Sequence, residues 1–207
     1  LARVLTKGKI MRLYALLLCT AFSGQVCAGF VDKQPVRPSH WATPVKKDAN
    51  LYQVDEKFYR SEQLTAEDVP AVHELGIKSV INLRYFDRND NEAILADSGI
   101  LLLNKPLLTW RIRPGQIAEI LYLIEQQQQQ GPVLVHCYHG ADRTGLISAM
   151  YRIIYHGWDI AEAKREMQQG SFGYHSIWKN IDRLLNEQTI TEVKAELSRL
   201  KQQSLHE

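Results

Sequence analysis

The sequence predicts an α/β fold in which a central, mostly parallel sheet is flanked by helices. From residue 51 onward, short apolar segments alternate with helical segments and polar loops, and this alternation favours a sheet with helical crossovers. The run 133–135 is apolar without alternation, as in a strand covered on both faces. With 207 residues, 45% of them hydrophobic and 23% charged, the chain is long enough to bury the core of one such domain.

Residues 1–28 are expected to lie outside this fold. From Met11 the chain has a basic Arg12, an apolar run at 13–22 and small residues ending at Ala28. This is the pattern of a secretory signal peptide, preceded by a leader at 1–10. The run is shorter than the ~20 residues that a membrane-spanning helix needs. We therefore expect cleavage after Ala28, a periplasmic or secreted protein, and no stable membrane anchor after cleavage.

The charge balance gives no reason to expect a nucleic-acid partner. The chain has 25 basic and 23 acidic residues, a net charge of +2, and no long basic block. Removal of residues 1–28 takes away four basic residues, so 21 remain against 23 acidic ones and the net charge becomes −2. Cleavage after Ala28 also removes Cys19 and Cys27. Cys137 would then have no partner for an internal disulfide.

The first half of the chain divides at its prolines and glycines. Residues 29–49 carry three prolines and little apolar periodicity, which indicates an irregular arm before a domain at 50–207. A strand is expected at 51–54. A helix is expected from Thr65 to Gly76, with acids in its first turn and the glycine as its end. The β-rich run 78–84 predicts another strand, followed by a polar loop through Asp90.

The second half continues the alternation. Gly99 closes a short helix, and Pro114 opens a longer one whose isoleucines and leucines fall on one stripe. Glu192 opens the last apolar stripe with helical spacing. We expect helices at 91–98, 114–129, 146–155, 176–188 and 192–205, and strands at 100–103 and 133–135.

A strand, a short polar loop and a helix start follow one another around Cys137. The five residues between Cys137 and Arg143 can curl so that their amides surround a phosphate, and the helix dipole adds partial positive charge. Arg143 can clamp two phosphate oxygens. The phosphate-binding residues expected here are Tyr138, His139, Gly140, Ala141 and Thr144.

The same loop favours nucleophilic chemistry on Cys137. Amides and a helix N-terminus stabilise a thiolate, which can attack phosphorus and form a phosphocysteine that water then hydrolyses. Thr144 could donate a hydrogen bond to the sulfur, and His136 is expected to bond near it. His136, Cys137 and His139 are three adjacent candidate ligands without a distant partner motif, so we expect neither a metal nor a cofactor.

The segment HCYHGADRTG at 136–145 resembles the His-Cys-x5-Arg-Thr/Ser signature of cysteine-dependent protein tyrosine and dual-specificity phosphatases. FYRSEQ at 58–63 and GIKSVINLR at 76–84 are similar to segments of small dual-specificity-like members, and the resemblance covers about residues 51–185. With its signal pattern, the chain is most similar to secreted bacterial members. The resemblance implies a protein tyrosine phosphatase-like fold and metal-free hydrolysis of phosphotyrosine, or also of phosphoserine and phosphothreonine, in proteins or small phosphomonoesters. A monomer is expected.

One departure from that family concerns the general acid. The family usually carries an aspartate some thirty residues before the cysteine, but no carboxylate occurs between Asp97 and Glu119. Asp142 is one replacement, in an arrangement that resembles myotubularin-like and Sac-type phosphoinositide phosphatases. Asp87 and Asp90 are another, and the absence of any dedicated acid is the third. Asp142 could instead cap the following helix.

Two further segments and two further functions stay open. Residues 110–113 (Trp-Arg-Ile-Arg) could line the mouth of the pocket or cover the helix start at Pro114, and residues 170–175 could form a loop near the pocket or a surface turn. Asp142 and the two histidines suggest a phosphoinositide or inositol-phosphate phosphatase as an alternative. The missing acid suggests a phosphate-binding pseudophosphatase.

Overall fold

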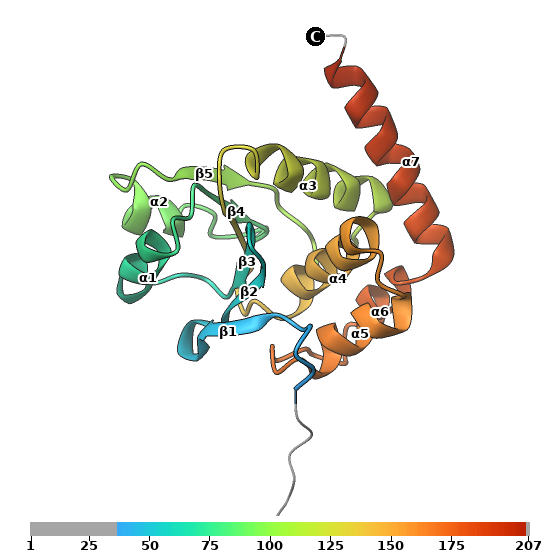
Figure 1. Ribbon diagram of the computed structural model, residues 1–207, viewed down its shortest axis with the longest axis horizontal. Helices are drawn as coiled ribbons and strands as arrows, with labels where there is room; N and C mark the ends of the chain where they lie inside the picture. Colours follow the sequence, from blue (N-terminus) through green and yellow to red (C-terminus); the bar gives the residue numbers. More distant parts are fainter. Residues whose placement is uncertain (1–36, 206–207) are drawn as a thin grey trace, which may run out of the picture. The chain divides into compact units, whose positions relative to one another are not determined.

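The computed structural model describes residues 37–205, which contain one six-stranded mixed sheet (Figure 1). Its strand order is β1-β2-β3-β6-β4-β5. β3, β6, β4 and β5 are parallel neighbours, whereas β1 and β2 add antiparallel strands at one edge. This confirms the predicted mostly parallel sheet. The strands are β1 (Thr43–Lys46), β2 (Leu51–Asp55), β3 (Phe58–Ser61), β4 (Ser79–Asn82), β5 (Leu101–Asn104) and β6 (Val133–His136).

Helices cover both faces of this sheet (Figure 1). Short helices α1 (Val69–Glu74) and α2 (Asp90–Leu95) lie on one face. The other face carries α3 (Pro114–Gln127), α4 (Asp142–His156), α5 (Ile160–Gln169), α6 (Lys179–Leu184) and α7 (Glu187–Ser204). Two single turns of 3-10 helix, Lys47–Ala49 and Ala66–Asp68, complete the elements.

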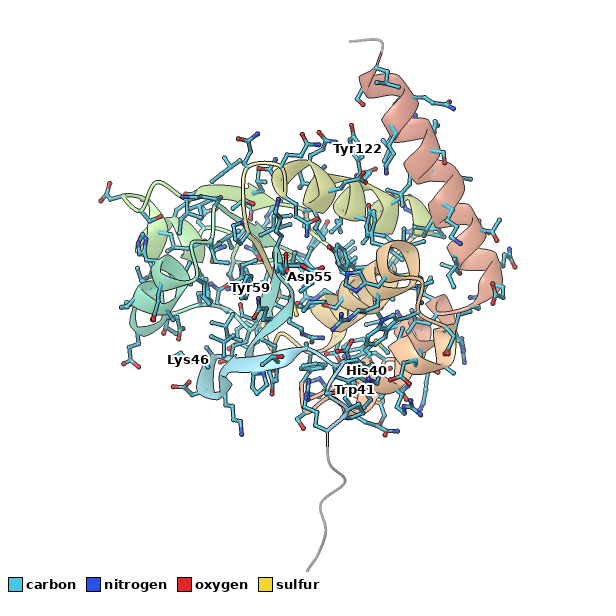
Figure 2. The ribbon with its side chains drawn as sticks, viewed as in Figure 1. His40, Trp41, Lys46, Asp55, Tyr59 and Tyr122 are labelled. Atoms are coloured by element: carbon cyan, nitrogen blue, oxygen red, sulfur yellow. The ribbon has the colours of Figure 1, made fainter. Side chains whose placement is uncertain are left out.

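Alternate residues of the central strand β6 enter two separate hydrophobic cores. Val133 and Val135 belong to the core beneath α3 and α4, whereas Leu134 belongs to the core beneath α1 and α2. All three are fully buried. Tyr59 of β3 points to the second core (Figure 2). The unbroken apolar run at 133–135 therefore reflects a strand covered on both faces, as the sequence predicts.

The arm predicted at 29–49 is wrong for its last residues. Residues 43–46 form β1, which pairs with β2 from Thr43↔Gln53 to Lys46↔Leu51, with an irregularity after Pro44. A proline is tolerated there because this is the edge strand of the sheet. Before β1, Trp41 Nε1 donates to Glu162 of α5 at 2.6 Å (Figure 2). Residues 29–36, like the signal peptide predicted at 11–28, lie outside the described residues.

Three other elements differ from the expectation. β3 forms a hairpin with β2, although its four residues are all buried and show no strand alternation. Helix α5 was not predicted. The helix break predicted at 189–191 is wrong, because the break between α6 and α7 falls at Leu185 and Asn186. The Asn186 side chain accepts a hydrogen bond from Thr189 N at 3.0 Å and caps the start of α7, and Ile190 is buried inside that helix.

The carboxyl ends of the parallel strands lie level with one another. Ser61 of β3 and Asn82 of β4 are both in register with His136 of β6. Residues that follow these three strands therefore meet at one edge of the sheet, which is where α/β proteins bind ligands. Within residues 37–205, no helix is long and apolar enough to cross a membrane.

Candidate active site

Cys137 begins the loop that joins β6 to α4. It follows the last strand residue, His136, and its side chain is 2% exposed. Helix α4 begins at Asp142, so four residues, 138–141, make the turn. The predicted strand, polar loop and helix start are therefore present, and the helix begins four residues earlier than the predicted 146.

Every carbonyl of this loop is hydrogen-bonded on its outer side. The donors come from five different residues, four of them N-terminal to the loop and one on α4. The bonds are His136 Nδ1 to Cys137 O at 3.0 Å, Gln63 N to Tyr138 O at 2.9 Å, Asn50 Nδ2 to His139 O at 2.8 Å, Arg60 Nη2 to Gly140 O at 2.5 Å and Gly145 N to Ala141 O at 3.0 Å.

The outward carbonyls fix the direction of the amides. In a planar trans peptide the N–H points opposite to the C=O, so the amides that follow these carbonyls point to the inner side of the loop. None of the backbone N–H groups at 138–141 donates to another group of the described chain. Inward-facing amides at the N-terminus of a helix form a site for an anion. The loop around Cys137 is thus built to hold one.

Gly140 is the one loop residue whose conformation requires glycine. Its φ is +67°, and a Cβ built there would lie 2.6 Å from the carbonyl oxygen of Ser61 and from Glu62 N. Those atoms are backbone and have little room to shift. Glycine therefore lets the loop rest directly on the end of β3.

Arg143 and Thr144 lie in the first turn of α4. The Arg143 guanidinium donates from Nη1 to Leu83 O at 3.2 Å and to Leu107 O at 3.4 Å, which ties it to the ends of the neighbouring segments. Arg143 and Tyr138 line cavities on both sides of the loop. Thr144 is fully buried, and its hydroxyl has no hydrogen-bond partner among the described residues.

Arg60 supports the loop from below. Its side chain is 1% exposed, and its guanidinium carbon lies 3.7 Å from the centre of the Phe172 ring. Nη2 holds Gly140 O, while Nε has no partner and no carboxylate of the described chain pairs with the group. Burial lowers the pKa of Arg60 to about 10, so it stays charged at neutral pH. A buried cation without a carboxylate raises the local potential where an anion would bind.

His136 was expected to bond near the sulfur, and it contacts the backbone of the same residue, Cys137. Its Nδ1 bonds the carbonyl of Cys137, not the sulfur, and its Nε2 lies 2.8 Å from Asn91 Nδ2. The ring is fully buried. Burial lowers the pKa of His136 to about 4, so the ring is neutral at pH 7.

The candidate acids lie on different sides of the loop. Asp142 is nearly buried, and both of its oxygens lie 2.9 Å from nitrogens of His175. Asp87 lines a cavity of about 180 Å³ on the other side, which Tyr138 and Arg143 also line. Asp90 pairs with Arg84 and lines none of the cavities beside the loop.

The two open segments both reach the site. Arg111 and Arg113 line a cavity of about 300 Å³ together with Tyr85, which also lines the Asp87 cavity. Trp110 is 60% exposed and lines none of these cavities. The segment 170–175 contributes His175 to a cavity of about 450 Å³ beside Asp142 and Arg143, so it is a loop of the site.

Sequence reasoning missed three residues that hold the loop and a fourth, Asn91, that holds His136. Arg60 and Gln63 lie inside the segment FYRSEQ, whose family resemblance was a usable signal. Asn50 and Asn91 carried no signal, because a lone asparagine before a strand or in a short helix has many ordinary roles. Within residues 37–205, no three or more His, Cys, Asp or Glu side chains gather as ligands for a metal ion.

Comparisons with known proteins identify the class of protein that this chain is similar to. The family model described as "Polymorphic toxin system, DSP-PTPase phosphatase" matches residues 54–158. The dual specificity protein phosphatase TpbA of Pseudomonas aeruginosa is 36% identical over 137 residues. That stretch covers 66% of this chain and 62% of TpbA, so the chain spans less than two thirds of this relative.

Solved structures give the same result for the fold. The crystal structure of P. aeruginosa TpbA has a TM-score of 0.72 at 30% identity and covers 78% of this chain and 99% of that one. A cysteine-to-serine variant of TpbA in complex with phosphotyrosine has the same score and identity, with 78% and 98% covered. The S. cerevisiae PP-IP phosphatase SIW14 matches with a TM-score of 0.59 at 22% identity, covering 75% and 94%, which supports the fold alone. The predicted protein tyrosine phosphatase-like fold of the dual-specificity type is confirmed.

Proposed function

Since the chain belongs to the DSP-PTPase phosphatase family, we propose that it hydrolyses phosphomonoesters through a phosphocysteine intermediate on Cys137. The observation that carries this proposal is the loop 137–141, whose carbonyls all accept hydrogen bonds from outside it, so that its amides point inward. Arg143 follows in the first helical turn, where its guanidinium can clamp two phosphate oxygens. The loop binds the dianion, and the thiolate attacks phosphorus opposite the leaving oxygen.

The rim of the loop favours phosphotyrosine as the substrate. Tyr138 is 55% exposed and Phe86 is 65% exposed, and both line the cavity that contains Arg143. Exposed rings beside a phosphate site suit an aryl phosphate, which can pack against them. Phosphoserine and phosphothreonine would use the same loop but gain less from these rings.

The adjoining cavity extends this argument to peptides. Arg111 and Arg113 are exposed, and their guanidinium groups make no ion pair within the described residues. Residues 98–118 contain no Asp or Glu to offset them. A phosphopeptide bound at Arg143 could pass Tyr85 and present an acidic side chain to this arginine pair. We therefore propose a protein or peptide substrate with acidic residues near the phosphotyrosine.

The inositol-phosphate alternative fits the same cavities less well. A ligand with phosphates all round its ring needs cations on every side, whereas the cavity beside Arg143 has the aromatic rings of Tyr85 and Phe86 in its wall. The other arginine of this cavity, Arg84, is already paired with Asp87 and Asp90. The pseudophosphatase alternative has to explain why the cysteine, the arginine and the inward amides are all kept. Both alternatives are outcomes of the experiment below.

Hydrolysis assays test the proposal directly. Residues 29–207 would be incubated with para-nitrophenyl phosphate, a phosphotyrosine peptide and an inositol-phosphate panel, with EDTA present. We expect turnover of the first two that is lost in Cys137→Ser and kept in the matched surface variant Ser198→Ala. Preferred hydrolysis of inositol phosphates would favour the alternative enzyme. Phosphate-ester binding by the unmutated protein without turnover would favour the pseudophosphatase.

Among the candidate carboxylates, we propose that Asp142 is the one that takes part in proton transfer to the leaving oxygen. It lies in the first turn of α4 beside Arg143 and lines the same cavity. Asp87 is 75% exposed and paired with Arg84, and Asp90 lines neither cavity, so both are weaker candidates. An Asp142→Asn variant should lose more activity on phenyl esters with a poor leaving group than on esters with a good one.

We also propose that the protein is exported. The support is the signal-peptide pattern at 11–28, which lies outside the described residues. Expression of the whole chain in bacteria, followed by fractionation and N-terminal sequencing, tests this. A periplasmic or secreted product beginning at Gly29 is expected, and an intact cytoplasmic product would contradict export.

A further inference from the structure

The carboxylate of Asp142 has both oxygens occupied by one residue. His175 N donates to Oδ1 at 2.9 Å, and His175 Nδ1 lies 2.9 Å from Oδ2. An ionised carboxylate accepts both bonds, whereas a protonated one would give up an acceptor position. The pair therefore favours a proton on His175 Nδ1 and none on Asp142. Asp142 is then badly suited to deliver a proton itself.

The segment that carries His175 is fixed to the phosphate loop. Phe172 is 2% exposed, and its carbonyl accepts from Asn50 Nδ2 at 2.9 Å, the same group that holds His139 O of the loop. Farther along, Asn180 Nδ2 donates to Thr109 O at 2.6 Å. His175 thus sits between two anchors, although 47% of its side chain is exposed.

The other ring nitrogen of His175 is available for chemistry. Within residues 37–205, no group hydrogen-bonds Nε2. The ring lines the cavity of about 450 Å³ that Tyr138, Asp142 and Arg143 also line. A substrate held by Arg143 would have its leaving group next to this cavity or the one on the other side of the loop. A carboxylate on Nδ1 with a free Nε2 is the arrangement that makes a histidine an acid and a base.

We propose that His175 transfers the leaving-group proton and that Asp142 is its positioning residue. This inference rests on the proposed function. In the first step the Cys137 thiolate forms the S–P bond and the P–O bond to the leaving group breaks. His175 enters this step as an imidazolium with a proton on both ring nitrogens, and the leaving oxygen takes the proton from its Nε2, which leaves the ring neutral. In the second step water attacks phosphorus, the S–P bond breaks to restore the thiolate, and His175 Nε2 takes the proton of that water.

A leaving-group series tests this assignment. The value of kcat/KM reports the steps through formation of phosphocysteine, so it would be measured for phenyl, para-nitrophenyl and 2,4-dinitrophenyl phosphate. In His175→Gln we expect a loss of about 100-fold or more on phenyl phosphate and less than about 3-fold on the dinitrophenyl ester, because a good leaving group needs no proton. His73→Gln on α1, an exposed histidine on the other face of the sheet, is the matched control.

Asp142→Asn separates the two roles. If Asp142 only positions His175, this variant should show the same steeper dependence on the leaving group but a smaller loss than His175→Gln. A normal dependence in His175→Gln together with a steep one in Asp142→Asn would overturn the assignment and return the proton to Asp142. A loss that is equal for all three esters would also overturn it. If the unmutated protein hydrolyses none of the esters, the proposed function fails and this inference fails with it.

Discussion

Asn91 Nδ2 lies 2.8 Å from His136 Nε2, and this contact determines which nitrogen of the buried histidine carries its proton. The orientation of the Asn91 amide is determined by a chain of hydrogen bonds that begins at Arg84. Arg84 Nη1 can only donate, so Gln63 Oε1 accepts at 2.7 Å, and Gln63 Nε2 donates to Asn91 Oδ1 at 2.9 Å. Asn91 Nδ2 must then donate to His136 Nε2. The proton of His136 is therefore on Nδ1, where it bonds Cys137 O.

The neutral state of His136 makes the stability of the fold depend on pH. Burial lowers the pKa of His136 to about 4 in the folded protein, against ~6.5 in an unfolded chain. Between these values the unfolded chain binds a proton that the folded one does not, so the free energy of unfolding falls as the pH falls. The contribution is fully present above pH ~6.5 and amounts to about 3 kcal/mol at most.

Urea unfolding between pH 7 and pH 4 measures this effect. The stability advantage of the unmutated protein over His136→Gln should shrink by up to about 3 kcal/mol across that range, because the other titrating groups cancel in the difference. His73→Gln, in which an exposed histidine is replaced, should keep a constant difference. A constant difference for His136→Gln would mean that folding does not change the pKa of His136.

Arg60 is expected to contribute to anion binding without contacting the anion. Its charge is buried below the loop, and its one hydrogen bond holds Gly140 O. In Arg60→Met both the charge and this bond are lost. We expect the inhibition constant of inorganic phosphate to rise by about 10-fold, which is within the range of a lost charge-assisted hydrogen bond.

Arg60→Lys separates the charge from the hydrogen-bond geometry. It should recover part of the phosphate affinity, because the charge remains. Thermal unfolding of both variants would be followed in parallel, since a change in stability alone would alter the melting temperature without altering inhibition by phosphate. Equal inhibition constants for the unmutated protein and Arg60→Met would contradict an electrostatic role.

Gly140 and Gly99 offer a matched comparison of backbone strain and close contact. Both have φ near +70°, but a Cβ on Gly140 would meet backbone atoms at 2.6 Å, whereas a Cβ on Gly99 would meet nothing within 4 Å. Alanine at either position carries the cost of a left-handed conformation, about 1–2 kcal/mol. Gly140→Ala must in addition push the loop away from Ser61.

The two alanine variants should therefore carry a similar backbone strain but differ in activity. For Gly99→Ala we expect a small loss of stability and unchanged kcat/KM on para-nitrophenyl phosphate. Gly140→Ala should lose kcat/KM by about 100-fold, because a displacement of the loop by 1 Å is enough to misplace its amides. Equal activity in the two variants would show that the loop tolerates the shift.

The part of the site that the sequence predicted best is the part whose residues are adjacent in the chain. Cys137, Arg143 and the loop between them follow one another, so their spacing alone specifies the strand, the turn and the helix start. The buried strand β6 was recognised for a similar reason, because a strand covered on both faces is apolar at every position. Neither prediction needed a contact with a distant part of the chain.

Supports from distant parts of the chain could not be predicted in this way. Arg60 and Asn91 reach the site because β3, β4 and β6 end at the same level of the sheet. Asn50 reaches it because β2 is antiparallel to β3 and begins beside the end of that strand. His175 lies 33 residues beyond Asp142, and nothing in a short window links the two. The misplaced helix break has a different cause, since the Asn186 cap on Thr189 N is a local signal that the sequence interpretation did not use.

The last prediction concerns Arg111 and Arg113, the pair proposed to bind an acidic side chain of the substrate. Phosphotyrosine peptides with Glu, Ala or Lys on both sides of the phosphotyrosine would be compared. We expect kcat/KM to be about 3-fold to 10-fold higher for the Glu peptide than for the Ala peptide, the range expected for exposed charge pairs. In the double variant Arg111→Gln with Arg113→Gln the ratio should approach 1, while turnover of para-nitrophenyl phosphate stays unchanged. Arg183→Gln with Lys194→Gln removes two exposed charges elsewhere and should keep the ratio.

Salt provides a second test of the arginine pair. Exposed charges are screened over a Debye length of roughly 10 Å at 0.1 M salt, so the ratio should fall as NaCl is raised from about 0.05 M to about 0.5 M. A ratio that the double variant leaves unchanged would exclude the arginine pair from substrate recognition.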